Sequence, residues 1–303
     1  YHVDVRCSDA IFQQLSQSYL KFRNTAKFCL DNLVDFDPNA LTKPEDMQAL
    51  DRWAVTKLNA LLEKCEAAYK DYEFLTVSHA INEFCVVTLS SLYLDIVKDR
   101  LYCDGKDSAE RKSAQSALWM ILDAMTKEFA PILAFTCNEI WLAMPHRTED
   151  DARNVVLNEM TKPYAGYALD ADKMAAWETA LQIRGDVNGV LETARADKRI
   201  GKALEAQVVL SALDAPAAEA LKMVSGMKLA EIFIVSDVKL AEAKTGAADA
   251  VAGSGSAYPG LVIEVLNAPG VKCPRCWMHS TDADADGLCP RCAAVMKALD
   301  VEV

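Results

Sequence analysis

The sequence is poor in the residue types on which enzyme active sites depend. It has four histidines in 303 residues, and none stands near a serine, cysteine or carboxylate at a spacing that suggests a catalytic triad. Its 12 glycines form no phosphate-binding loop between a strand and a helix. By composition and motif the chain has no active site, which favours a binding function.

Long apolar runs are also missing. The longest covers residues 129–135, which is far shorter than a membrane span, and Pro131 interrupts it. Residues 1–8 alternate in polarity and carry charge, unlike a secretory signal. We therefore expect a soluble, cytoplasmic protein that has no membrane partner.

Positive charge is in short supply, because 32 lysines and arginines face 44 acidic residues and leave a net charge of −12. This balance argues against nucleic acid, since phosphate contacts need clustered basic side chains. An acidic protein can still bind RNA through a local basic face. Two basic groups have acidic neighbours and are interpreted as ordinary solvated surface: Lys21, Arg23 and Lys27, and Arg195, Lys198, Arg199 and Lys202.

Four of the ten cysteines form two identical knuckles, Cys273-Pro-Arg-Cys276 and Cys289-Pro-Arg-Cys292. Each knuckle can turn two sulfurs onto one ion, and four thiolates are the tetrahedral set of a structural zinc site. Such a site is closed, so the metal would fold the tail and catalyse nothing. A rubredoxin-like iron site, two disulfides or four unrelated thiols are the alternatives.

The remaining cysteines are scattered, mostly on apolar faces of expected helices. Reduced cysteine is used in this way as a small apolar residue in cytosolic proteins. These cysteines are Cys7, Cys29, Cys65, Cys85, Cys103 and Cys137. Close to the knuckles, His279 is a weaker candidate ligand, and the alternating aspartates Asp282, Asp284 and Asp286 lack the rest of a calcium loop.

Helical periodicity dominates residues 8–144. Apolar residues recur at three- and four-residue steps and predict five amphipathic helices in an antiparallel bundle. Ser8 is a suitable N-cap for the first helix. The stripe of that helix consists of Ile11, Leu15, Tyr19, Phe22, Ala26, Cys29 and Leu33.

After Pro145 the pattern changes to a small α/β unit. We expect helices at residues 172–197 and 216–225, strands at 155–157, 206–210, 231–235 and 261–266, and a mobile loop at 241–256. The fold class is therefore mainly α: an antiparallel helical bundle, then a small α/β unit and a C-terminal four-cysteine zinc ribbon. The expected divisions are residues 1–8, 9–145, 146–268 and 269–303.

The finger itself carries groups that suit RNA. Arg275 and Trp277 flank Cys276, and Lys272 and Arg291 are close by in the sequence. An aromatic ring and guanidinium groups on a rigid backbone are how single-stranded bases are held. Packing of Trp277 against the small core of the ribbon is the alternative.

Several short motifs along the chain belong together. The bundle contains Arg23-Asn24-Thr25, Leu50-Asp51-Arg52-Trp53, Lys98-Asp99-Arg100-Leu101-Tyr102 and Glu139-Ile140-Trp141. The C-terminal part contains Ile200-Gly201, Leu204-Glu205-Ala206 and Cys273-Pro274-Arg275-Cys276-Trp277. Taken together, these motifs closely resemble the C-terminal region of bacterial isoleucyl-tRNA synthetases, which are class I enzymes.

The resemblance implies an anticodon-binding fragment of an enzyme that joins isoleucine to tRNA(Ile) with ATP. The family signatures His-Ile-Gly-His and Lys-Met-Ser-Lys-Ser and the editing domain are absent, so we expect an inactive fragment, with ATP and magnesium confined to the missing catalytic part. Residues 1–8 would be a remnant of the connecting strand, and the partners would be tRNA(Ile) and the catalytic domain of a monomeric chain. The implied RNA contacts are Arg275, Trp277, Lys272, Arg291, Arg23, Asn24 and Arg52.

Two other functions stay open. The finger and the α/β unit could form a zinc-stabilised protein-interaction or docking module, which the acidic balance favours. The chain could also be the equivalent region of a valyl- or leucyl-tRNA synthetase, which the terminal finger disfavours. Arg23 and Arg52 could equally make ion pairs between helices.

Overall fold

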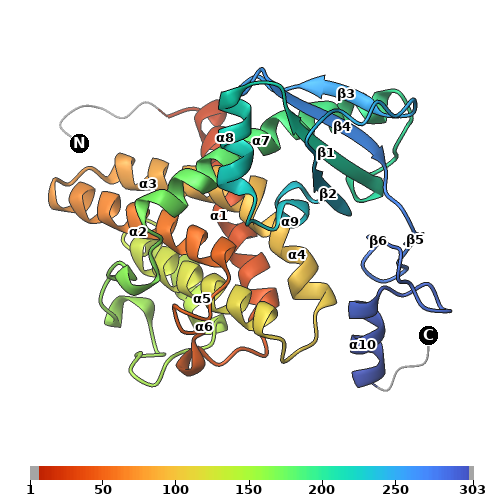
Figure 1. Ribbon diagram of the computed structural model, residues 1–303. Coiled ribbons are helices and arrows are strands. Elements are labelled where there is room, and N and C mark those ends of the chain that lie inside the picture. Colours follow the sequence, from red (N-terminus) through yellow and green to blue (C-terminus); the bar gives the residue numbers. More distant parts are fainter. Residues whose placement is uncertain (1–6, 300–303) are drawn as a thin grey trace. The chain divides into compact units, whose positions relative to one another are not determined.

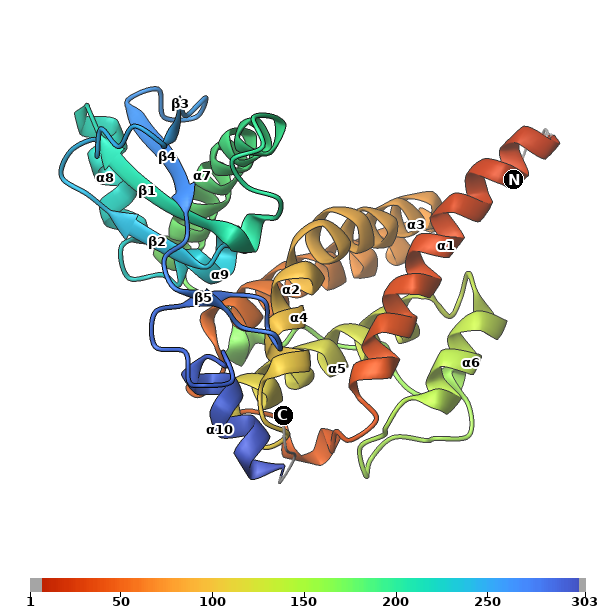
Figure 2. The same cartoon turned by 90° about the vertical axis from the view of Figure 1, so that its right-hand side faces the viewer.

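A computed structural model describes residues 7–299, and the chain divides into two compact units after Leu169. Most of the expected connecting-strand remnant, residues 1–6, lies outside the described residues. The first unit is a bundle of helices, and the second combines a small sheet with helices and the cysteine-rich tail (Figures 1 and 2).

The bundle of the first unit confirms the five expected helical rods. The rods are α1 (Asp9–Asn32), α2 (Ala49–Lys70), the run α3 (Phe74–Glu83), η2 (Phe84–Tyr93) and α4 (Leu94–Cys103), α5 (Ala109–Phe129) and α6 (Ala134–Ala143). Ser8 caps α1 as expected, because its hydroxyl accepts a hydrogen bond from the Ile11 amide at 3.4 Å. The η2 segment is a π-helix, which the sequence periodicity did not indicate.

The continuous helix Phe74–Cys103 is long and apolar enough to cross a membrane by length and composition alone. Its most apolar window is 56% buried inside the protein, and α2 packs against it along α3 and η2. A central helix of a bundle has the same composition as a membrane span, because apolar neighbours replace lipid around it. This helix is therefore explained by its place in the bundle.

The apolar stripe of α1 is buried along only half its length. Phe22, Ala26 and Cys29 lie in the core, whereas Ile11 and Leu15 are 40% and 60% exposed. The first turns of α1 extend beyond the other helices of the bundle (Figure 2). Periodicity shows which face of a helix is apolar, but it does not show how far the neighbouring helices reach.

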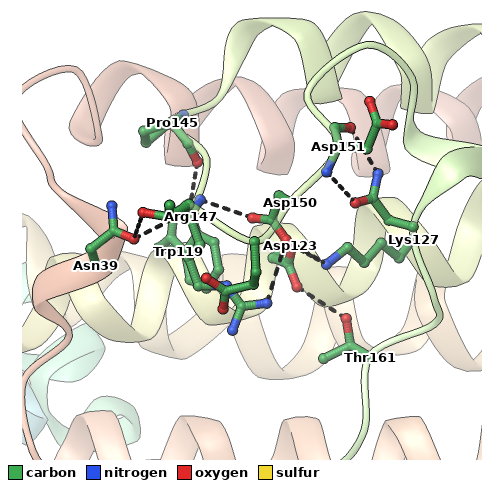
Figure 3. Close-up of polar contacts among 12 residues, drawn as sticks. Asn39, Trp119, Asp123, Lys127, Pro145, Arg147, Asp150, Asp151 and Thr161 are labelled. Carbon is green, nitrogen blue, oxygen red and sulfur yellow. Dashed lines mark hydrogen bonds and ion pairs between the residues drawn. The ribbon is translucent and has the colours of Figure 1, made fainter.

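The helix α5 is buried on every side, since all residues from Ser113 to Phe129 are buried. Two of its buried charges, Asp123 and Lys127, form an ion pair. Lys127 lies 2.7 Å from Asp123 and 3.7 Å from Asp150 (Figure 3). Asp123 also accepts a hydrogen bond from Thr161 at 3.0 Å. These contacts attach the irregular segment after Pro145 to the bundle.

That irregular segment corrects one expectation. Residues 155–157 form the 3-10 turn η3 (Val155–Leu157), not a strand. Asn154 caps the turn by accepting a hydrogen bond from the Val156 amide, and Asn138 of α6 accepts one from the Val155 amide. Backbone amides held by side chains in this way have no need of a neighbouring strand.

Glu128 at the end of α5 makes the stability of the bundle depend on pH. Burial, and then the charge of Glu66, raises the pKa of Glu128 to about 7. A carboxyl whose pKa is higher in the folded state favours folding at low pH, so its contribution is lost as pH rises from about 4.5 to 7. We expect Glu128→Gln to exceed the parent in unfolding free energy by about 2–3 kcal/mol at pH 8, with little difference at pH 4.5.

Urea unfolding of both proteins at the two pH values measures this difference. Glu63→Gln removes an exposed carboxyl from α2 and should change stability by less than about 0.5 kcal/mol at either pH. Equal stability of Glu128→Gln and the parent at pH 8 would contradict the expectation.

The second unit begins with α7 (Ala171–Ala196), and its sheet has the strand order β2-β1-β4-β3. The strands are β1 (Ala206–Ala212), β2 (Asp237–Leu240), β3 (Val251–Ser254) and β4 (Leu261–Asn267). The crossover from β1 to the parallel strand β2 contains α8 (Ala215–Val224) and α9 (Leu229–Phe233). Both α8 and α9 pack against α7.

The prediction of a strand at residues 231–235 is wrong, because this run belongs to α9 and the turn that ends it. Ile232 and Phe233 are buried, and Ile234 has φ +57°, a left-handed conformation that reverses the chain before β2. A short apolar run fits a buried strand and a buried helix equally well, so periodicity cannot separate them.

The segment 241–256 is more ordered than the expected mobile loop. Its strand β3 pairs with β4, and Glu264 of β4, fully buried, accepts hydrogen bonds from the Thr245 amide at 2.7 Å and the Thr245 hydroxyl at 2.8 Å. Asp186 of α7 accepts two more from Ser256. Each end of the segment is therefore held by a carboxylate.

The cysteine-rich tail consists of a two-stranded hairpin and a helix. The strands β5 (Val271–Lys272) and β6 (His279–Ser280) pair antiparallel, and α10 (Pro290–Ala298) follows. The first knuckle lies between the two strands. The second opens α10, with Cys289 at its N-cap; the sequence analysis did not include this helix.

Candidate metal centre and nucleic-acid interface

The four knuckle sulfurs converge on one point. The Sγ atoms of Cys273, Cys276, Cys289 and Cys292 all lie within 4.8 Å of one another, and those of Cys276 and Cys289 are 3.7 Å apart. Zinc–sulfur bonds of about 2.3 Å set at tetrahedral angles place sulfurs about 3.8 Å apart. The cluster therefore fits a structural zinc ion. All ten cysteines lie within the described residues and are free thiols. The alternative of two disulfides is therefore not found among these residues.

The surroundings of these thiols favour a metal-bound thiolate set. Burial opposes ionisation of Cys273, but the backbone amides of Cys276, Cys289 and Arg275 lower its pKa to about 6. For Cys276, burial and then the neighbouring sulfurs raise the pKa. Four adjacent thiolates repel one another, so a divalent cation is what allows all of them to be deprotonated together.

The first knuckle is held by a close set of backbone hydrogen bonds. The Cys273 amide donates to the Met278 carbonyl, and the Trp277 amide donates to the Cys273 carbonyl, each at 2.9 Å. Trp277 has φ +66°, which is uncommon for a bulky residue and indicates that the surrounding structure fixes it. Gly270, at φ +90°, permits the entry to the hairpin, because a Cβ there would lie 2.2 Å from the Ser280 carbonyl oxygen.

The aspartates after the hairpin form a turn. Asp284 accepts hydrogen bonds from the amides of Asp286 and Leu288 at 3.0 and 2.9 Å, and Gly287 adopts φ +76°. These contacts occupy Asp284 Oδ1 in shaping the backbone. The aspartates therefore belong to a turn between β6 and α10.

Trp277 lies at the surface of the ribbon, with 54% of its area exposed. The ammonium of Lys202 lies 5.1 Å from the centroid of its ring. Arg275 donates a hydrogen bond from Nη1 to the Cys292 sulfur at 3.5 Å, so its guanidinium is oriented by the cluster. Lys272 pairs with Glu205 at 3.4 Å, and Arg291 occupies the first turn of α10.

The other expected RNA contacts belong to the first unit. Arg23 and Asn24 are adjacent and exposed on α1. Arg52 on α2 is partly buried and donates to the backbone carbonyls of Tyr167 and Ala168 at 3.1 and 2.7 Å. Its guanidinium thus holds the end of the irregular segment to the bundle. The alternative role for Arg52 was an ion pair between helices, whereas the contacts seen are hydrogen bonds to backbone carbonyls.

Sequence reasoning missed two residues of the finger's surroundings, Lys202 and Glu205. Both lie in the α/β part, around the short turn η5 (Ala203–Glu205), and the sequence pattern predicted only a solvated surface for Lys202. Only the fold brings that turn next to Trp277. The sequence offered one signal for a role of Glu205: it lies in the motif Leu204-Glu205-Ala206, which has no obvious chemistry.

Two family models match the chain. The anticodon-binding domain of tRNA ligase matches residues 51–210, and a zinc finger described as found in FPG and IleRS matches residues 270–295. The first match covers more than half of the chain. The chain therefore belongs to the family of tRNA-ligase anticodon-binding domains.

Isoleucine–tRNA ligases are among the curated relatives that the chain matches. The isoleucine–tRNA ligases of Syntrophotalea carbinolica and Geobacter sulfurreducens are 42% and 41% identical to it over 98% of this chain. That of Caldanaerobacter subterraneus is 39% identical over 97%. The chain spans about a third of the length of these relatives, between 31% and 32%, and corresponds to their C-terminal region.

Proposed function

We propose that the chain is the part of an isoleucine–tRNA ligase that binds the anticodon stem-loop of tRNA(Ile). The observation that carries the proposal is the exposed Trp277 ring fixed beside the four-cysteine cluster. A rigid aromatic ring with basic groups around it suits the unstacked bases of an RNA loop. The family match over residues 51–210 supports the same function.

We assign Cys273, Cys276, Cys289 and Cys292 as the ligands of one structural zinc ion. Four protein ligands complete the tetrahedral shell, so the metal keeps no open position for a substrate. Arg275, which donates to the Cys292 sulfur, supports the outer shell of the site. ATP and magnesium would be used only by a catalytic part that these residues do not contain.

The remaining assignments extend from the relatives to the whole enzyme. The full-length ligase would join isoleucine to tRNA(Ile) in the cytoplasm as a monomer, and this portion alone would be inactive. Three successive parts of this portion would together bind the tRNA. They are the bundle at residues 9–145, the junction at 146–268 and the finger at 269–303. Arg23, Asn24 and Arg52 are weaker candidates for RNA contact than the finger.

Replacing the finger's two central groups tests the proposal. We expect Trp277→Ala to weaken binding of a tRNA(Ile) transcript about five- to 150-fold, since stacking of one base contributes about 1–3 kcal/mol. Arg275→Ala should also weaken binding and make it less dependent on salt. Filter binding of the zinc-loaded chain at two salt concentrations measures both effects.

Metal content and far-UV circular dichroism of each variant show that the ribbon is intact. Arg153→Ala provides a charge-matched control, because Arg153 is exposed and pairs with its neighbour Asp151. If both finger variants bind tRNA as tightly as the parent, the finger is structural only.

A protein-docking role is the second candidate, and the net charge of −12 favours it. It predicts that tRNA binding is absent or insensitive to salt, because an acidic docking face makes no phosphate contacts. The same titration therefore separates the two functions.

A further inference from the structure

Lys202 and Trp277 are far apart in the sequence but adjacent in the second unit. The Lys202 Nζ atom lies 5.1 Å from the indole centroid, and both residues are exposed. A cation close to an aromatic face is held there by the charge distribution of the ring. The pair therefore places a positive charge over one face of an exposed indole ring.

The turn that carries Lys202 is fixed by Glu205. Its Oε2 atom accepts hydrogen bonds from the Gly201 amide at 2.8 Å and the Lys202 amide at 3.3 Å, while Oε1 lies 3.4 Å from the Lys272 ammonium of β5. The Glu205 carbonyl also accepts from the Ala268 amide at 2.7 Å. One residue thus ties the Lys202 turn to the first strand of the finger.

A second bridge holds the other strand. The Ser236 hydroxyl donates to the Leu204 carbonyl at 2.5 Å and accepts from the His279 amide of β6 at 2.8 Å. Both strands of the hairpin are therefore connected to the turn that carries Lys202. This framework therefore holds the backbone of the Lys202 turn beside the hairpin that carries Trp277.

We propose that Lys202 and Trp277 form one composite site for a single-stranded nucleotide of RNA. The base stacks on the Trp277 ring, the Lys202 ammonium contacts the phosphate of the same nucleotide, and Glu205 is a positioning residue for both. Stacking rings combined with cations along the backbone are the general means of binding single strands. This inference rests on the proposed function and adds Lys202 and Glu205 to it.

Replacement of Lys202 tests the phosphate contact. With a tRNA(Ile) transcript, Lys202→Ala in the zinc-loaded chain should weaken binding about five- to tenfold at low salt and lower the slope of log affinity against log salt by about 0.7–1. Lys202→Arg should keep most of the parent's affinity and most of its salt dependence. The matched control is Lys222→Ala, because Lys222 is an exposed lysine of the same unit paired with Glu219.

Replacement of Glu205 tests whether this residue positions Lys202 and Trp277, because the two possible explanations predict opposite changes in tRNA affinity. Removing a negative charge near RNA would by itself tighten binding. If Glu205 positions Lys202 and Trp277, Glu205→Ala instead weakens binding while the zinc content stays at one per chain. Tighter binding by Glu205→Ala would overturn the positioning role.

The remaining outcomes separate this inference from the function on which it rests. A parent chain that does not bind tRNA contradicts the proposed function. A parent that binds with normal salt dependence, together with a Lys202→Ala variant equal to Lys222→Ala, overturns the composite site alone. Weaker binding by Lys202→Ala at an unchanged salt slope overturns the phosphate contact.

Discussion

Cys276→Ser and Cys292→Ser are expected to release the zinc ion, unfold the finger and weaken tRNA binding more than any single contact variant. Each removes one of four converging sulfurs, and a structural zinc contributes an apparent free energy on the order of 10 kcal/mol to the folding of small finger domains. Without the ion, the Trp277 turn and the start of α10 lose their common anchor. Elemental analysis should give about one zinc per chain for the parent and close to none for the variants.

Cys7→Ser is the matched control, because Cys7 is an exposed thiol outside the cluster. It should keep its zinc and its tRNA affinity. Hydrogen exchange should show loss of protection in residues 271–298 of the cluster variants and unchanged protection in α5. A metal-free chain whose finger stays protected from exchange would contradict the assignment of a structural zinc site. Bound iron instead of zinc would support the rubredoxin-like alternative.

The finger and the bundle were predictable for different physical reasons. Two cysteines separated by two residues can meet at one ion in almost any context, so the metal site follows from local spacing. The helical rods follow from periodicity, because each apolar stripe has to be covered. Neither signal contains information on contacts between distant segments.

Several features that the sequence analysis missed depend on such distant contacts. Glu264 holds Thr245 across the sheet, and Lys202 meets Trp277 only because η5 lies beside the finger. Residues 231–233 belong to α9, which packs against α7, although the composition of the run 231–235 suits a strand. These are cases in which tertiary packing overrides local preference.

Asp51 and Arg100 support the second large prediction, because they form a buried ion pair at the centre of the bundle. The Arg100 guanidinium donates to both carboxylate oxygens of Asp51 at 2.9 and 3.0 Å, and Tyr93 donates to the same carboxylate at 2.8 Å. Asp51 is fully buried and Arg100 is 4% exposed. Arg100→Met should lower the unfolding free energy by about 3–5 kcal/mol, since it leaves a carboxylate buried without its cation.

Urea unfolding followed by tryptophan fluorescence measures this loss, and Lys98→Ala is the control. Lys98 pairs with Asp95 on the surface of the same helix, with both side chains 48% exposed, so its loss should cost less than about 1 kcal/mol. The double variant Asp51→Leu with Arg100→Met removes both charges and should recover part of the stability. A single variant as stable as Lys98→Ala would contradict the expectation.

The stability and the tRNA binding of Arg100→Met also show whether the sequence motifs of the bundle serve folding or RNA contact. Asp51 and Arg100 lie in two of the sequence motifs that carry the family resemblance, and Arg52 in the same motif as Asp51 binds backbone carbonyls. If Arg100→Met is unstable but binds tRNA normally when folded, these motifs maintain the bundle and the RNA contacts lie elsewhere. The search for those contacts then narrows to exposed groups: Arg23 and Asn24 on α1, and the finger with Lys202.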